Sequence, residues 1–195
     1  MFVTWRLWGS LPQAVLVQLR EHADRERAKV ASQEGEFLVT RRSTGNYGSP
    51  ASRIAAKEFL RVDKLLDRAA AGPVWLKDER IAPLVVESLG HAAKTLESCE
   101  LHAYVVMANH VHILITPREP IARITKSIKS YSARKANAIL RRTGTPFWQD
   151  ESFDHWVRSE ASFWRIKDYI ERNPVKAGLV SKPEDWPWSS AAQSP

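Results

Sequence analysis

Two apolar strand patterns separated by only two residues constrain the fold of this chain more than any other feature. The first covers residues 101–107 and the second residues 110–116, with Ala108-Asn109 between them. Such a gap is typical of an antiparallel β-hairpin, although Ala-Asn is a weaker turn signal than Asn-Gly. The sequence therefore predicts a hairpin over residues 101–116.

Strand and helix patterns surround this hairpin. Alternation predicts strands over residues 2–7 and 153–158. Helical spacing predicts helices over residues 11–30, 53–71, 79–98, 120–142 and 160–173, with a polar loop at 40–52. We expect Gly144 to close the fourth helix, Ser159 to cap the fifth, and Pro174 to end the fifth at Asn173. This order of elements predicts an α+β sandwich, in which helices pack on an antiparallel sheet.

Length and composition indicate a folded domain. The chain has 195 residues, of which 44% are hydrophobic, and a single cysteine, Cys99. These values exclude wholesale disorder and an internal disulfide. We expect one domain over residues 1–195, with a long helical and loop region at about 40–98. The absence of a long apolar run or a signal-peptide pattern predicts a cytoplasmic protein that has no membrane partner.

The positive charge is concentrated in one stretch. The formal net charge is +7, and residues 118–146 contain eight Lys or Arg residues against a single acidic residue, Glu119. Such a surface suits the phosphates of a nucleic acid, although a solvated helix face explains it equally well. The candidate DNA-binding residues within this stretch are Arg123, Lys126, Lys129, Arg134 and Lys135.

His110-Val111-His112 is the sharpest local signal for chemistry. Side chains alternate along a strand, so His110 and His112 point the same way and their rings can converge on one metal ion. A His-x-His pair alone is also compatible with structural histidines. Two ligands leave a metal site incomplete, and a third has to come from elsewhere in the chain.

Tyrosines are the candidate nucleophiles. Packing explains Tyr104 and Tyr131, and Tyr47 lies in the polar loop. Tyr169 differs because Asn173 follows four residues later, where the same helix face could present a phenol and an amide ligand together. From spacing alone, ordinary packing fits Tyr169 equally well.

Several motifs in the second half of the chain together resemble a known family, the REP-associated tyrosine transposases. These belong to the single-tyrosine HUH transposases of bacterial insertion sequences. The resemblance is strong over residues 101–190 and weak elsewhere. It rests on Met-Ala-Asn-His-Val-His at 107–112, Phe-Trp-Gln at 147–149, Phe-Asp-His-Trp-Val-Arg at 153–158, Tyr-Ile-Glu-Arg-Asn-Pro-Val-Lys-Ala-Gly-Leu-Val at 169–180 and Asp-Trp-Pro-Trp-Ser-Ser at 185–190.

The resemblance implies a role for each matching residue. His110 and His112 would bind a divalent metal, Mg²⁺ or Mn²⁺, and Asn173 would be the third ligand. Tyr169 would be the nucleophile, whereas His155 would be structural or would orient the substrate. The family commonly has Pro where this chain has Ala108, which changes the stiffness of the turn rather than a ligand.

The resemblance also implies an activity and a fold. The expected protein has a ferredoxin-like HUH sandwich and cleaves and rejoins single-stranded DNA at hairpin-containing, REP-like sites. The intermediate is a 5′-phosphotyrosine linkage, so neither ATP nor another nucleotide cofactor is required. Some of the eight Trp would stack on unpaired bases. The sequence leaves open whether the protein is a monomer or a homodimer, and whether Tyr169 acts within its own subunit.

Other functions fit parts of the sequence. A domesticated DNA-hairpin-binding protein would keep the fold without transposition. An RNA-binding sheet domain fits the charge, but the aromatic strand signature of such domains is absent. A metal hydrolase acting on small phosphoesters would turn over without a protein-linked intermediate.

Overall fold

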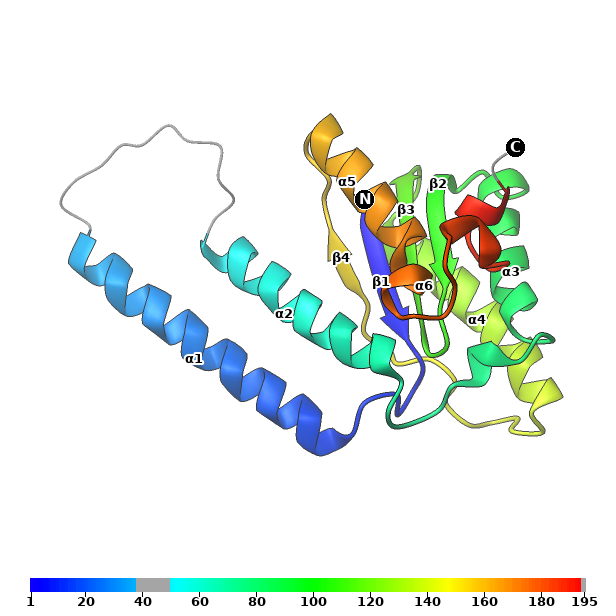
Figure 1. The fold of residues 1–195 in the computed structure, drawn as a ribbon, viewed down its shortest axis with the longest axis horizontal. Helices are drawn as coiled ribbons and strands as arrows, with labels where there is room; N and C mark the ends of the chain where they lie inside the picture. Colours follow the sequence, from blue (N-terminus) through cyan, green and yellow to red (C-terminus); the bar gives the residue numbers. More distant parts are fainter. Residues whose placement is uncertain (38–49, 194–195) are drawn as a thin grey trace. The chain divides into compact units, whose positions relative to one another are not determined.

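The computed structural model describes residues 1–37 and 50–193 (Figure 1). Contacts within the chain divide it into two compact units. The sheet unit comprises Met1–Ser10 and Gly72–Pro195, and the helical unit comprises Leu11–Ala71. The expectation that residues 1–195 act as one domain stays a prediction.

Four strands form the antiparallel sheet of the sheet unit, in the order β2-β3-β1-β4. They are β1 (Phe2–Arg6), β2 (Cys99–Val106), β3 (His110–Pro117) and β4 (Phe153–His155). The predicted hairpin is confirmed, because the Met107 N–H donates to the His110 carbonyl at 2.9 Å and Ala108 and Asn109 form the tip. β4 is shorter than the strand predicted over 153–158, since its last residue already pairs with Phe2 at the start of β1.

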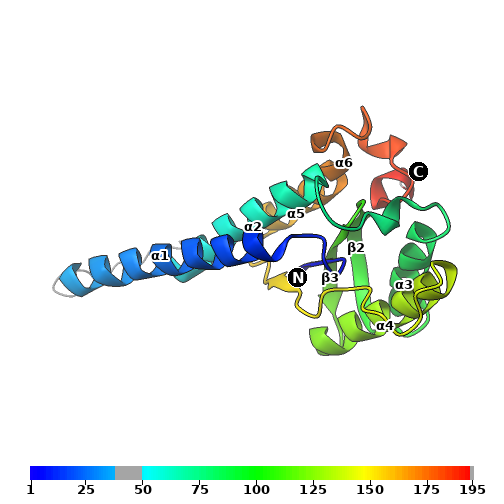
Figure 2. The same cartoon turned by 90° about the horizontal axis from the view of Figure 1, so that it is seen from below.

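Helices cover both faces of this sheet (Figures 1 and 2). The longer helices are α3 (Ala82–Lys94), α4 (Ile121–Ile139) and α5 (Glu160–Glu171), and the shorter ones are α6 (Asn173–Lys176), η1 (Trp75–Lys77), η2 (Pro183–Asp185) and η3 (Ser190–Gln193). The α+β architecture, an antiparallel sheet with helices packed on it, is therefore confirmed.

The two faces of the sheet have different side chains and different helices. Trp5 and Ile113 belong to the main apolar core together with Val85 of α3 and Ile128 of α4. Residues that alternate with these, including the two histidines of β3, point to the opposite face. On that face, α5 contacts β2 and β3.

The ends of α4 and α5 correct two expectations. α4 ends at Ile139, and the left-handed residue that reverses the chain is Arg141, with φ 56°, so Gly144 does not close the helix. The cap at Ser159 is confirmed, since its hydroxyl accepts a hydrogen bond from the Ser162 N–H at 3.2 Å. Asn173 is helical rather than excluded from helical geometry, because Pro174 lies in the first turn of α6, where its missing N–H is not needed.

The helical unit consists of α1 (Gln13–Phe37) and α2 (Pro50–Arg68). An ion pair joins the two helices, between Arg27 and Glu58 at 3.5 Å. The predicted loop over residues 40–52 is wrong at 50–52, which begin α2 with Pro50 at its first position, and its other residues lie outside those described. Among the described residues, no helix combines the length and apolar character needed to cross a lipid bilayer.

Candidate metal and nucleophile site

Strand β3 places the two predicted histidines on one face of the sheet. His110 and His112 have ring centroids 4.7 Å apart, and both side chains are fully buried. Val111, between them, points into the apolar core on the other face. The strand therefore brings two imidazoles together, as its alternation predicts.

Two oxygen atoms fix the orientation of these imidazoles. The Nδ1 of His110 lies 2.7 Å from the Asn109 side-chain oxygen, and the Nδ1 of His112 lies 2.7 Å from the Thr4 hydroxyl. When each Nδ1 carries the proton for its hydrogen bond, the Nε2 of each ring is the nitrogen that can bind a metal. Sequence reasoning missed Thr4, which becomes visible only once β1 and β3 are paired, with Thr4 opposite His112.

Asn173 reaches the same place from α6. Its side-chain nitrogen lies 3.3 Å from the His112 Nε2. Its side-chain oxygen is buried and has no hydrogen-bond partner among residues 1–37 and 50–193. The two ends of an amide are nearly the same size, so a rotation of the amide would turn this oxygen toward His112. An imidazole nitrogen and an amide oxygen then lie side by side, as a shared metal ion requires.

Tyr169 completes the group from the last turn of α5. Its ring packs edge-on against His112, with centroids 5.8 Å apart, and against Phe2 at 6.2 Å. The Lys176 ammonium lies 3.9 Å from the centre of the Tyr169 ring. The structure therefore brings together all four residues predicted for the site, namely His110, His112, Tyr169 and Asn173.

The other tyrosines and His155 lie elsewhere. Tyr131 is on α4, on the other side of the sheet, and its hydroxyl donates to Glu87 at 2.9 Å, which raises the pKa of Tyr131. Tyr104 belongs to the apolar core, whereas Tyr47 lies outside the described residues. His155 is exposed on the edge strand β4.

The predicted DNA-binding residues all lie on α4. Because the apolar side of α4 packs on the core face, the structure does not bring these cations to the histidines. Four are exposed, namely Arg123, Lys126, Arg134 and Lys135. Lys129 differs, since its ammonium donates to the carbonyls of Gln149 and Asp150, at 2.6 and 2.8 Å, and burial lowers its pKa.

The eight tryptophans fall into three groups by burial, of which the half-buried group is Trp75, Trp186 and Trp188. Trp5 and Trp148 are buried in the core. Trp8, Trp156 and Trp164 have between 45% and 59% of their surface exposed. The exposed group offers the most ring surface for stacking on a base.

A sheet that carries two convergent histidines, faced by a helix with a tyrosine, is the arrangement that the sequence motifs imply for a DNA-cleaving transposase. The family described as Transposase IS200 like matches residues 75–173, which is about half of the chain and includes all four site residues. The chain belongs to the IS200-like transposase family.

Two curated relatives are similar to part of this chain. The REP-associated tyrosine transposase of Escherichia coli (strain K12) is 29% identical over 91 residues, which are 47% of this chain and 53% of that protein. The putative REP-associated tyrosine transposase of Haemophilus influenzae is 26% identical over 106 residues, covering 47% of this chain and 58% of that protein. The chain thus matches little more than half the length of these relatives.

One solved structure is similar as well. It is described as a REP-associated tyrosine transposase bound to a REP hairpin. The TM-score is 0.48 at 16% identity, and the match covers 98% of this chain and 76% of that one.

Proposed function

We propose that this chain is a metal-dependent transposase that cleaves and rejoins single-stranded DNA at hairpin-containing sites through a 5′-phosphotyrosine intermediate on Tyr169. One observation carries the proposal. Segments more than fifty residues apart, β3 and the α5–α6 corner, place two imidazoles, an amide and a phenol against one another, with Asn173 3.3 Å from His112. Membership of a transposase family and similarity to REP-associated tyrosine transposases support DNA as the substrate.

The donor set fits a divalent cation. His110, His112 and Asn173 would hold it through two imidazole nitrogens and one amide oxygen, and the buried Asn173 oxygen without a partner among the described residues is the observation that favours this. The chemistry that such a cation supplies when bound is polarisation of the scissile phosphate. Mg²⁺ and Mn²⁺ are the expected ions, although two imidazoles favour Mn²⁺ over the harder Mg²⁺.

The residues of the chain itself perform the strand cleavage. The Tyr169 oxygen forms a bond to phosphorus while the bond from phosphorus to the 3′ oxygen breaks. The phenol loses its proton and the leaving 3′ oxygen gains one, so the step needs no energy source and is reversed by another 3′-hydroxyl. The positive charge of Lys176, next to the Tyr169 ring, favours the negative charge that develops on the phenol oxygen. The Phe2 and His112 rings stack on each other, with centroids 5.7 Å apart, and both contact the Tyr169 ring edge-on.

The exposed cations of α4 suit the DNA backbone, but they lie on the face opposite the histidines. A strand that contacts both therefore has to pass an edge of the sheet. The edge strands are β2 and β4. This requirement favours a flexible single-stranded segment over a stiff duplex between the two regions.

The test is the formation of a covalent adduct. The protein is incubated with labelled single-stranded oligonucleotides from the DNA that flanks its own gene, with Mn²⁺ or Mg²⁺, and the products are separated under denaturing conditions. Tyr169→Phe removes the nucleophile, and Tyr131→Phe is the matched control because it lies on the other side of the sheet. We expect an adduct that is lost only with Tyr169→Phe. Hairpin binding without an adduct in either metal would instead indicate a domesticated DNA-binding protein.

A further inference from the structure

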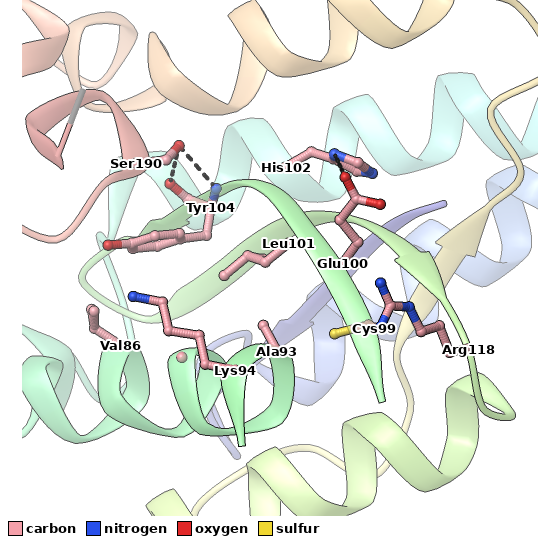
Figure 3. Close-up of a pocket in the computed structure, with 11 residues that line it drawn as sticks. Val86, Ala93, Lys94, Cys99, Glu100, Leu101, His102, Tyr104, Arg118 and Ser190 are labelled. Atoms are coloured by element: carbon pink, nitrogen blue, oxygen red, sulfur yellow. Dashed lines mark hydrogen bonds and ion pairs between the residues drawn. The ribbon is translucent and has the colours of Figure 1, made fainter. Parts of the chain in front are cut away.

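A cavity separate from the candidate site lies within the sheet unit, at the edge strand β2. Its volume is about 540 Å³, and α3 and β2 form its two long walls (Figure 3). Gly90 and Lys94 line it from α3, Leu101 and Tyr104 from β2, and Arg118 from the residues that follow β3. Its volume is within the usual range for small-ligand pockets. None of the proposed metal ligands lines it.

The cavity has a cation at each end. Lys94 extends toward the Tyr104 ring, whereas Arg118 lies at the other end, beside Cys99 (Figure 3). Both side chains are exposed, and within residues 1–37 and 50–193 neither forms an ion pair. Glu100, the acidic residue among those lining the cavity, lies 3.7 Å from the His102 ring instead. The cavity is thus suited to a ligand that combines a negatively charged group with an apolar or planar part.

Gly90 supplies an independent observation. It lies inside α3, where glycine makes a helix less stable than alanine does. Its φ is not positive, and a Cβ added there would meet no heavy atom within 4 Å. Neither backbone conformation nor crowding therefore requires a glycine at this position. The missing side chain leaves room for a ligand to lie against the backbone of α3.

Hydrogen bonds connect this cavity to the region of the candidate site. The Ser190 hydroxyl, which lines the cavity, accepts from the Tyr104 N–H at 3.1 Å and lies 2.9 Å from a Glu171 carboxylate oxygen. Glu171 is two residues from Tyr169 along α5. On the sheet, Val105, next to Tyr104, pairs with His112. A DNA strand that passes the β2 edge would therefore reach the cavity close to the site of cleavage.

From these observations we infer that the cavity binds one unpaired nucleotide of the DNA strand that the protein cleaves. Lys94 and Arg118 neutralise the phosphates next to this nucleotide, and its ring lies between Leu101 and the bare backbone at Gly90. This inference rests on the proposed function, because it takes the occupant from the proposed substrate. A free nucleotide has the same chemistry, so the experiment separates the two sources.

The main experiment fills the cavity. Gly90→Phe occupies the space above α3, and Gly90→Ala is the matched control that leaves it open while favouring the helix. Both are made in Tyr169→Phe protein, so that binding is measured without cleavage, and circular dichroism checks the fold. Affinity is measured for a set of single-stranded oligonucleotides, each lacking one base at a successive position. We expect one position in the oligonucleotide at which removal of the base lowers the affinity of the Gly90→Ala protein about tenfold. Removal of the same base should leave the affinity of the Gly90→Phe protein unchanged.

A second pair of variants tests the charges. Lys94→Gln with Arg118→Gln should flatten the dependence of log affinity on log salt by about 0.7 for each phosphate that the protein no longer neutralises, and Lys77→Gln, an exposed control, should not. The inference is wrong if the Lys94 and Arg118 changes leave the salt slope unaltered and if Gly90→Phe and Gly90→Ala respond alike to base removal at every position of the oligonucleotide. That result leaves the adduct on Tyr169 unaffected, so it is distinct from failure of the proposed function.

The last arm uses deoxynucleoside monophosphates alone and measures the thermal unfolding temperature. A rise with Gly90→Ala that is absent with Gly90→Phe shows that the cavity takes a free nucleotide, even in a protein that forms no adduct. If no monophosphate raises this temperature and no oligonucleotide binding depends on Gly90, the cavity is not a nucleotide site.

Discussion

The Thr4 hydroxyl and the Asn109 side-chain oxygen lie where they can accept a hydrogen bond from the Nδ1 of His112 and of His110. Both lie 2.7 Å from a histidine Nδ1, and in His112 this is the ring nitrogen that does not face the Asn173 amide. Partners of this kind fix the tautomer of a metal-binding histidine and typically alter metal affinity 10- to 100-fold. We therefore regard Thr4 and Asn109 as positioning residues rather than ligands.

Thr4→Val tests this role. Valine has nearly the shape of threonine but cannot accept the His112 Nδ1 hydrogen bond, so Mn²⁺ affinity should fall at least about tenfold while the fold is kept. Isothermal titration with Mn²⁺ measures this, and Thr4→Ser, which keeps the hydroxyl, should restore most of the affinity. Equal Mn²⁺ affinities for the Val variant and the unchanged protein would show that Thr4 does not orient His112.

Asn173→Ala tests the third ligand. Because the amide oxygen would contact the metal rather than the DNA backbone, this change should reduce metal-dependent cleavage far more than DNA binding. Asn173→Asp retains an oxygen donor and should recover part of the cleavage rate. Cleavage rates and DNA affinities are compared for the three proteins, and equal losses of both with Asn173→Ala would remove Asn173 from the ligand set.

At the scale of elements, local periodicity predicted which site residues share a face, but it did not predict which residues of other elements surround them. The period of a strand puts His110 and His112 on one face, and the short distance between Tyr169 and Asn173 along the chain keeps them together. Thr4 could not be assigned in advance, because its position depends on the register between strands that lie far apart in sequence. The face on which α4 packs also depends on tertiary contacts, so the distance between its cations and the histidines was not predictable.

The contacts of α4 separate two lysines that look equivalent in the sequence. Lys126 is exposed, so Lys126→Gln should flatten the salt dependence of single-stranded DNA affinity by about 0.7 on a log-log scale. Lys129 holds the carbonyls of Gln149 and Asp150, so Lys129→Gln should instead reduce the free energy of unfolding by about 1–3 kcal/mol. Salt titrations and chemical denaturation of both variants measure these effects. An unchanged slope with Lys126→Gln would show that this side of α4 is an ordinary solvated surface that does not contact DNA.

At the scale of the whole molecule, the helical unit is inserted between two adjacent points of the sheet unit. A Cβ on Gly72 would lie 2.2 Å from the Gly9 carbonyl oxygen and 2.8 Å from the Ser10 Cα, so only glycine, here with φ +77°, allows this approach. The chain thus leaves the sheet unit after β1 and returns beside the same residues. Sequence patterns did not reveal this closure, because no linker composition marks either end of the insertion.

Replacing residues 11–71 by a short Gly-Ser linker tests this organisation. Since Ser10 and Gly72 already lie together, β1 should still pair with β3, and the shortened protein should unfold cooperatively on heating. Circular dichroism during thermal unfolding measures this. Loss of cooperative unfolding would show that residues 1–195 fold as one domain, as the sequence analysis expects.

The central claim is that Tyr169 attacks DNA, and peptide mapping of the covalent adduct tests it most directly. Trypsin cleaves after Lys167 and Arg172, so Tyr169 is released within residues 168–172, whereas Tyr131 is released within residues 130–134. After nuclease digestion, mass spectrometry should find the added nucleotide on the peptide 168–172, joined through its 5′ phosphate. An adduct on the peptide 130–134, or a linkage through a 3′ phosphate, would contradict the account.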